Sequence, residues 1–245
     1  MSSISISNIF KSYNAQKFVL KDISFKINEG EKIGILGPNG AGKTTLISIL
    51  CGIIEANKGE VHYYENCQNI HYKQFKTILG YVPQDLAFYQ ELSPIQNLNY
   101  FGAMYGLTKT TIKKKSLELF KILGLEKVKN DKSMNFSGGM KRRLNLAISI
   151  LHEPKILFLD EPTVGIDVQS KNAIITFLNE LNEKGTTIIY TSHLLKEAES
   201  LCDRVLLIDQ GEIIALNTID ELKAQTNINS LEEIFLNLTG IEYRD

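Results

Sequence analysis

The chain has 245 residues, of which 43% are hydrophobic and 22% charged, an ordinary globular composition that excludes disordered and fibrous proteins. Its 27 basic and 28 acidic residues give a net charge of −1, which argues against a protein that binds nucleic acid mainly by electrostatics. The three cysteines form no CxxC pair, which argues against a zinc site or a disulfide framework. No stretch approaches about 18 consecutive apolar residues, so we expect no membrane span. The length predicts one large domain, or one domain with a small subdomain.

Short apolar runs predict strands in the N-terminal third of the chain. They lie at residues 3–9, 20–27, 32–36, 59–64 and 79–82. A glycine-rich loop follows the third of these strands directly. After this loop, residues 44–51 are expected to form a helix.

The character of the sequence changes at residues 93–151. Apolar residues recur there at helical spacing, and two helices joined near Gly106 account for the pattern up to residue 125. We therefore predict that 93–151 is an inserted helical subdomain.

An alternation of strands and helices resumes after the insertion. Strands are expected at 156–159, 186–191 and 205–208, with helices at 168–183 and around 231–238. Such an alternation predicts a largely parallel sheet with helices on both faces. The fold class is therefore α/β, with residues of about 1–92 and 152–245 forming its core.

The strongest chemical signal is a P-loop, G-x4-G-K-[ST], between the strand at 32–36 and the helix at 44–51. Its residues are Gly37, Pro38, Asn39, Gly40, Ala41, Gly42, Lys43 and Thr44. Glycines let the backbone curl around a phosphate with its N–H groups pointing inward, and the helix N-terminus favours an anion. Lys43 would reach the β- and γ-phosphates, and the Thr44 hydroxyl would bind Mg²⁺. A glycine-rich turn with a chance lysine is the alternative.

A second signal is the apolar run at 156–159, which ends in Asp160 and Glu161. In open α/β sheets, ligands bind at the carboxyl ends of the strands. Asp160 suits a direct or indirect role in holding Mg²⁺, and Glu161 could polarise a water molecule. Taken alone, the pattern also fits a strand that ends in a solvated turn.

A third signal is Ser137, Gly138 and Gly139, followed by basic residues at 141–143. Ser137 is a candidate helix N-cap. Basic residues at a helix start oppose the usual dipole preference, so an anionic group could lie nearby. Taken alone, a capped helix with a solvated basic face is the favoured interpretation.

The segments GPNGAGKTT, SGGMKRR and LFLDEPTVGID, in this order, resemble the nucleotide-binding subunit of ATP-binding cassette (ABC) transporters. The resemblance covers nearly the whole chain. It implies a P-loop NTPase fold with a mixed or parallel sheet, an N-terminal antiparallel β region and an inserted helical subdomain. It also implies ATP and Mg²⁺ as ligands, and it extends the phosphate-binding loop to Thr45.

The resemblance assigns four further positions. Gln84 would touch Mg²⁺ and the attacking water, and His193 would orient that water and contact the γ-phosphate. Asp167 would lie in the nucleotide site, and Tyr13 would stack on adenine. From the residues alone, a surface glutamine, a structural histidine, a helix N-cap and a core tyrosine remain open at these positions. Glu161 would be the general base.

In this family the Ser-Gly-Gly segment, here Ser137, Gly138 and Gly139, is called the signature. Each ATP lies between the P-loop of one subunit and the signature of another. The chain has one copy of each, so the resemblance implies a second ATP-binding subunit, most simply another copy. ATP-driven closure would bring Ser137 and Gly139 of the partner onto the γ-phosphate. A separate permease would be contacted through the Gln84 loop, with this chain on the cytoplasmic face of the membrane.

The SGGMKRR variant, LCDRVLLIDQGEII at 201–214 and SLEEIFLNLTG at 230–240 look most like the ATPases of ABC-2-type drug exporters. An importer ATPase is one alternative. A soluble ABC ATPase acting on ribosomes or DNA is another, although such members usually carry two cassettes or long coiled coils. A non-hydrolysing cassette is a third, but Glu161 and His193 are both present.

Overall fold

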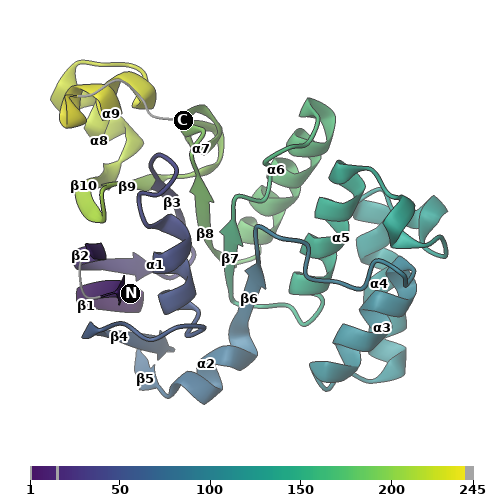
Figure 1. Cartoon of the computed structure of the whole chain (residues 1–245). Coiled ribbons are helices and arrows are strands. Elements are labelled where there is room, and N and C mark those ends of the chain that lie inside the picture. Colours follow the sequence, from purple (N-terminus) through teal and green to yellow (C-terminus); the bar gives the residue numbers. More distant parts are fainter. Residues whose placement is uncertain (1, 15–16, 241–245) are drawn as a thin grey trace.

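The computed structural model describes residues 2–14 and 17–240, which form two sheets with helices packed around them (Figure 1). The smaller sheet is antiparallel, as predicted, with strand order β2-β1-β4-β5. Its strands are β1 (Ser2–Asn14), β2 (Lys17–Asn28), β4 (Lys58–Glu65) and β5 (Gln68–Ile70). The sequence did not indicate β5, because three residues are too few to show an alternating pattern.

The larger sheet has six strands in the order β10-β9-β3-β8-β7-β6. These are β3 (Lys32–Leu36), β6 (Leu79–Val82), β7 (Ile156–Asp160), β8 (Thr187–Ser192), β9 (Arg204–Asp209) and β10 (Glu212–Thr218). All neighbours pair in parallel except β9 and β10. Leu36 pairs with Ser192, and Asp160 with Thr191, so β3, β7 and β8 end at the same edge.

The larger sheet separates two hydrophobic cores. Successive residues of a strand point to opposite faces. On β7, Ile156 and Phe158 therefore join one core, with the antiparallel sheet and α1 (Lys43–Leu50). Leu157 and Leu159 join the other core, together with side chains of the helices that follow β6 in the chain. Burial on both faces explains why β7 reads as an uninterrupted apolar run.

Three helices make up most of the predicted helical region. They are α3 (Pro94–Met104), α4 (Lys109–Ile122) and α5 (Gly138–Ile150), with short 3-10 turns at Glu126–Val128 and Ser133–Asn135. Gly106 lies between α3 and α4 with a left-handed φ of 75°, as its position in the sequence suggested. α3, α4 and α5 lie beyond β6, on the side of the sheet opposite the antiparallel strands (Figure 1).

The other helices are α2 (Tyr72–Ile78), α6 (Val168–Glu183), α7 (Leu195–Leu201), α8 (Ile219–Thr226) and α9 (Leu231–Thr239). The sequence predicted α6 and α9. It missed α2, α7 and α8, which have seven or eight residues each and so span only about two turns of helical period. Within the described part of the chain, no helix combines the length and the apolar character needed to cross a membrane.

Candidate active site

The glycine-rich loop joins β3 to α1 and requires glycine at several positions. Gly40 and Gly42 have left-handed φ angles of 78° and 107°. A Cβ atom on Gly37 would lie 2.0 Å from the carbonyl oxygen of Ile208 on β9. Gly42 is the N-cap of α1 and offers no side chain to the first-turn amides. The start of α1 is therefore suited to bind an anion with its backbone N–H groups.

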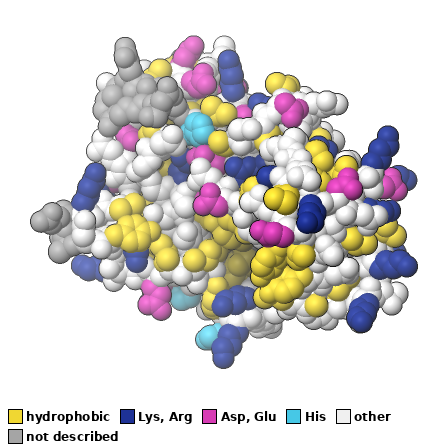
Figure 2. Space-filling view, turned by 45° about the vertical axis from the view of Figure 1, so that its right-hand side comes forward, with side chains coloured by type: hydrophobic (Ala, Val, Ile, Leu, Met, Phe, Trp, Pro, Cys, Tyr) yellow, Lys and Arg dark blue, Asp and Glu magenta, His cyan; other side chains and the backbone are white. Residues whose placement is uncertain are grey.

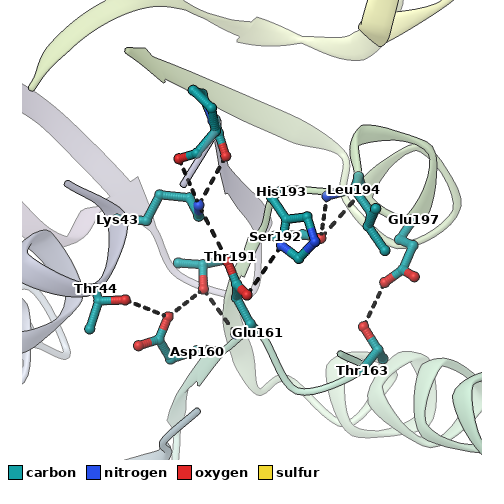
Figure 3. A network of polar contacts seen from close by, with 12 residues as sticks. Lys43, Thr44, Asp160, Glu161, Thr163, Thr191, Ser192, His193, Leu194 and Glu197 are labelled. Atoms are coloured by element: carbon teal, nitrogen blue, oxygen red, sulfur yellow. Dashed lines mark hydrogen bonds and ion pairs between the residues drawn. The ribbon is translucent and has the colours of Figure 1, made fainter. Parts of the chain in front are cut away.

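The Lys43 side chain turns back into this loop and is buried, with 5% of its surface exposed. Its Nζ donates to the carbonyl oxygens of Gly37, at 2.9 Å, and Pro38, at 3.1 Å. It also forms an ion pair with Glu161, at 3.3 Å (Figure 3). The one cation of the loop thus lies where β3 and β7 end.

Asp160 ends β7 and is almost fully buried. Its Oδ1 accepts hydrogen bonds from the hydroxyls of Thr191, at 2.7 Å, and Thr44, at 3.3 Å (Figure 3). Its Oδ2 is buried and has no hydrogen-bond partner among the described residues. Burial raises the pKa of this carboxyl above its ordinary value, and the Thr191 hydrogen bond acts in the opposite direction. A desolvated carboxylate oxygen beside a threonine hydroxyl fits the oxygen ligands that Mg²⁺ prefers.

Glu161 is also buried, with 5% exposed, which excludes the solvated turn considered above. Its backbone has a left-handed φ of 48°, an uncommon and costly conformation for a residue with a side chain. Its N–H donates to the Thr191 hydroxyl at 3.0 Å. The carboxylate lies between the Lys43 Nζ and the His193 Nδ1, which is 3.2 Å from Oε2 (Figure 3). The fold therefore brings Lys43, Asp160, Glu161 and His193 together.

Gln84 is not brought into this cluster by any hydrogen bond. It lies in the exposed loop after β6, and among the described residues no hydrogen bond joins its side chain to Asp160 or Glu161. Its backbone carbonyl instead accepts a hydrogen bond from the Arg142 guanidinium of α5. Its contact with Mg²⁺ and water remains a prediction.

The interpretation favoured in isolation for the basic start of α5, a capped helix with a solvated basic face, is right about the cap but wrong about Arg142 and Arg143. Arg142 bonds to the Gln84 carbonyl, and Arg143 donates to the carbonyl oxygen of Leu123 at 2.7 Å. Both side chains are partly buried. The partners that offset the unfavourable helix dipole are backbone carbonyl oxygens of neighbouring segments.

Ser137 and Asp167 cap the adjoining helices α5 and α6. Ser137 accepts from the Met140 N–H at 3.3 Å, and Asp167 accepts from the Ser170 N–H at 2.8 Å, a bond that lowers the Asp167 pKa. A Cβ on Gly139 would lie 2.3 Å from the Ser170 hydroxyl, so only glycine lets α5 start this close to α6. Both caps are exposed. Among the described residues, no hydrogen bond or ion pair joins either cap to Lys43.

Tyr13 is 65% exposed and is therefore not a core residue. Its hydroxyl lies 3.3 Å from the Thr45 hydroxyl, near the start of α1. The Lys11 Nζ lies 5.4 Å from the centre of its ring. Tyr13 thus places an accessible aromatic ring beside the phosphate-binding loop.

The sequence reasoning missed Thr191, which contacts both acidic residues of the site. Its hydroxyl donates to Asp160 and accepts from the Glu161 N–H. The signal available was its place near the end of a buried strand, two residues before His193. A threonine there is common in any sheet, so the pattern alone did not distinguish it.

A family model described as "ABC transporter" matches residues 20–164. The linearmycin resistance ATP-binding protein LnrL of Bacillus subtilis (strain 168) is 43% identical over 237 residues, which cover 94% of this chain and 76% of LnrL. A solved ATP binding subunit of an ABC transporter superposes with a TM-score of 0.86 at 28% identity, covering 97% of this chain and all of that one. A dimeric ATP-binding cassette in a post-hydrolysis state, bound to ADP and Pi, has a TM-score of 0.79 at 25% identity and covers 88% and 98%.

Proposed function

From the premise that the chain belongs to the ABC transporter family and is an ATPase, we propose that it energises the export of a substrate through a separate membrane permease. The observation that carries the hydrolytic part is the convergence of Lys43, Asp160, Glu161 and His193. We favour export over import because LnrL, which aligns with 94% of this chain, is named for resistance to linearmycin, and export of a toxic compound is one way to confer resistance.

The phosphates of ATP would be held by the backbone N–H groups at the start of α1 and by Lys43. Lys43 is already held among acceptors, so the phosphate would compete with Glu161 and two carbonyl oxygens for the same ammonium group. Mg²⁺ would be held by Thr44 and Asp160, where it supplies neutralisation of phosphate charge. The Thr191 bond to Oδ1 leaves the other Asp160 oxygen facing no protein donor among the described residues.

Glu161 would accept the proton of the attacking water, and His193 would orient that water and contact the γ-phosphate. The carboxylate of Glu161 is held from two sides, by Lys43 and by His193, which limits the positions that it can adopt. A base held within hydrogen-bond reach of its target is what general base catalysis requires. Burial also keeps bulk water away from these groups.

A second copy of the chain would complete each site. Ser137, Gly138 and Asp167 are exposed on the surface formed by the starts of α5 and α6. This surface makes no hydrogen bond or ion pair to Lys43 within the described part of its own chain, which supports a role in a partner's site. The dimeric cassette bound to ADP and Pi is a related precedent. We infer a homodimer that closes on ATP.

The closing motion would reach the permease through the loop that carries Gln84. The bond from Arg142 to the Gln84 carbonyl connects this loop to α5, whose first turn contains the signature glycines. Movement of α5 on dimer closure would thus move the loop. The permease would hold the chain at the cytoplasmic face of the membrane, and nucleic acid is not expected as a partner.

Membrane fractionation tests the transport assignment. The chain would be expressed with and without the products of its neighbouring genes, and both cultures would be separated into membrane and supernatant fractions. We expect the chain to pellet with membranes only when the permease is present, and the cells then to gain export-dependent resistance that Glu161→Gln abolishes. A chain that never associates with the permease, or that co-sediments with ribosomes instead, would contradict the proposal.

A further inference from the structure

A cluster of four side chains, three of them buried, lies next to the candidate active site without being part of it. It consists of Thr163 after β7, Tyr190 on β8, Lys171 on α6 and Glu197 on α7. Tyr190, Thr163 and Glu197 are buried, the last with 7% exposed, and Lys171 reaches them from the surface. Figure 3 shows the Thr163 to Glu197 contact beside the His193 and Glu161 pair.

Glu197 is the common acceptor of this cluster. Its Oε2 accepts from the Thr163 hydroxyl at 2.5 Å and from the Tyr190 hydroxyl at 2.9 Å, and its Oε1 pairs with the Lys171 Nζ at 3.0 Å. The two hydroxyls lie 2.8 Å apart. Each hydroxyl has one proton, so only two of the three contacts in this triangle can be hydrogen bonds at once, and the carboxylate oxygen is the acceptor to which both hydroxyls can donate. Burial and the neighbouring Glu197 raise the pKa of Tyr190, which keeps its hydroxyl protonated and donating.

Each segment held by Glu197 carries one candidate residue of the active site. Thr163 lies two residues after Glu161, in the turn closed by the bond from the Val164 N–H to the Glu161 carbonyl at 3.3 Å. Glu197 lies in the first turn of α7, and His193 lies in the short connection between β8 and this helix, two residues before Leu195. Lys171 lies four residues after Asp167, on the helix that Asp167 caps.

The connection matters most for Glu161, because its left-handed backbone is costly and persists only where surrounding contacts enforce it. The Thr191 hydroxyl holds one end of the turn, at the Glu161 N–H. Glu197 holds the other end, at Thr163. These two contacts together constrain the turn that carries Glu161 from both ends.

We propose that Glu197 is a positioning residue for ATP hydrolysis, which sets Glu161, His193 and the Asp167 end of α6 relative to one another. This inference rests on the hydrolytic roles proposed above for Glu161 and His193. The side chain of Glu197 contacts Thr163, Lys171 and Tyr190, so it acts on Glu161 and His193 through the segments next to them.

The main test is Glu197→Gln. Glutamine has the same shape as glutamate. If its amide oxygen accepts from the two hydroxyls, its NH₂ group faces the Lys171 ammonium, so two donors oppose each other. We expect kcat to fall about 10- to 100-fold, since displacements near 1 Å and lost outer contacts have effects of this size. The KM for ATP should stay unchanged, because the phosphate-binding loop is not touched.

Glu199→Gln is the matched control on the same helix. Glu199 accepts from the Leu231 N–H at 2.9 Å and pairs with Lys223, so it ties α7 to α8 and α9 and not to the active site. We expect this variant to lose a similar amount of thermal stability while keeping wild-type kcat. Equal kcat values for the two variants would overturn the proposal, because a merely structural role predicts that result.

Thr163 gives a second, independent test. Thr163→Ser retains the hydroxyl and should keep kcat, whereas Thr163→Val removes it at similar volume and should lower kcat in the same way as Glu197→Gln. Equal activities of the serine and valine variants would also overturn the inference. Glu161→Gln is measured in parallel. If it is fully active, the hydrolytic assignment fails, and if it is inactive while Glu197→Gln turns over normally, only the positioning role fails.

Discussion

The Nζ of Lys43 lies 3.3 Å from Oε1 of Glu161, so the cation of the phosphate-binding loop and the candidate general base form a buried ion pair. The two residues come from different motifs, and the pairing of β3 and β7 with β8 brings them together. A phosphate at the loop would have to share Lys43 with this carboxylate. The fold thus places the residue proposed to bind phosphate directly beside the residue proposed to activate water.

Lys43→Ala should abolish ATP binding or hydrolysis, because it removes the side-chain cation of the loop. It should also lower the free energy of unfolding by about 3 kcal/mol, because it leaves Glu161 without its buried lysine partner. We expect the lower end of the usual range because His193 remains beside Glu161. Nucleotide binding, turnover and thermal unfolding are the measurements. Adding Glu161→Gln to this variant should recover part of the lost stability but none of the activity. Retained turnover in the Lys43→Ala variant itself would disprove the P-loop assignment.

Glu161→Gln should leave ATP binding intact and lower turnover by about 10²–10⁴-fold, the usual effect of losing a positioned base. The amide keeps the volume of the side chain in its buried place between Lys43 and His193. Because ATP then persists, the dimer should remain closed in sedimentation experiments. Wild-type turnover in this variant would show that another group activates the water.

Asp160→Asn should raise the melting temperature of the metal-free protein while abolishing Mg²⁺-dependent hydrolysis. Burial raises the Asp160 pKa, so the ionised form is less favourable in the folded than in the unfolded chain. This destabilisation is complete above the folded pKa and disappears as the pH falls below the ordinary value. The stabilising effect of the variant should therefore be present at neutral pH and vanish in acid. Unfolding curves at both pH values check the sign, and a lower melting temperature at neutral pH would contradict the argument.

Tyr13→Ala should weaken nucleotide binding by about 1–3 kcal/mol, the range for a base stacked on an aromatic ring. Tyr13→Phe should bind almost as well as the wild type, because stacking needs no hydroxyl. Titration with a fluorescent ATP analogue gives both affinities. If the phenylalanine variant is as weak as the alanine variant, the hydroxyl contact with Thr45 at 3.3 Å is what matters, and the stacking role is wrong.

A mixture of two inactive variants tests the site shared across the dimer. Ser137→Arg should bind ATP through its own loop but block the site of its partner, and Lys43→Ala lacks the loop cation. A mixed dimer has one site with an intact loop facing an intact Ser137, so partial activity should appear that neither variant has alone. Sedimentation with ATP is run in parallel, because a Ser137→Arg homodimer that closes as readily as wild type would exclude a role in trans.

The sequence by itself determined those parts of the protein whose signal is contiguous. The loop at 37–44 with its flanking strand and helix, and the buried strand that ends at Asp160, are encoded by neighbouring residues, so local pattern was sufficient. The helices α3 and α4 were predicted for the same reason, whereas the antiparallel pairing of the N-terminal strands was implied by the resemblance to the ABC family.

Only the tertiary structure decided which side chains meet. The ion pair of Lys43 with Glu161, and the bonds of Thr191 and Glu197 to the Glu161 turn, depend on the register of parallel strands joined by long crossovers. Strands that are buried on both faces read as uninterrupted apolar runs, so their local pattern carries no alternation from which the register could be inferred. The partners of Arg142 and Arg143 were hidden as well, since their acceptors are backbone carbonyls, which every residue has and which only the fold can place.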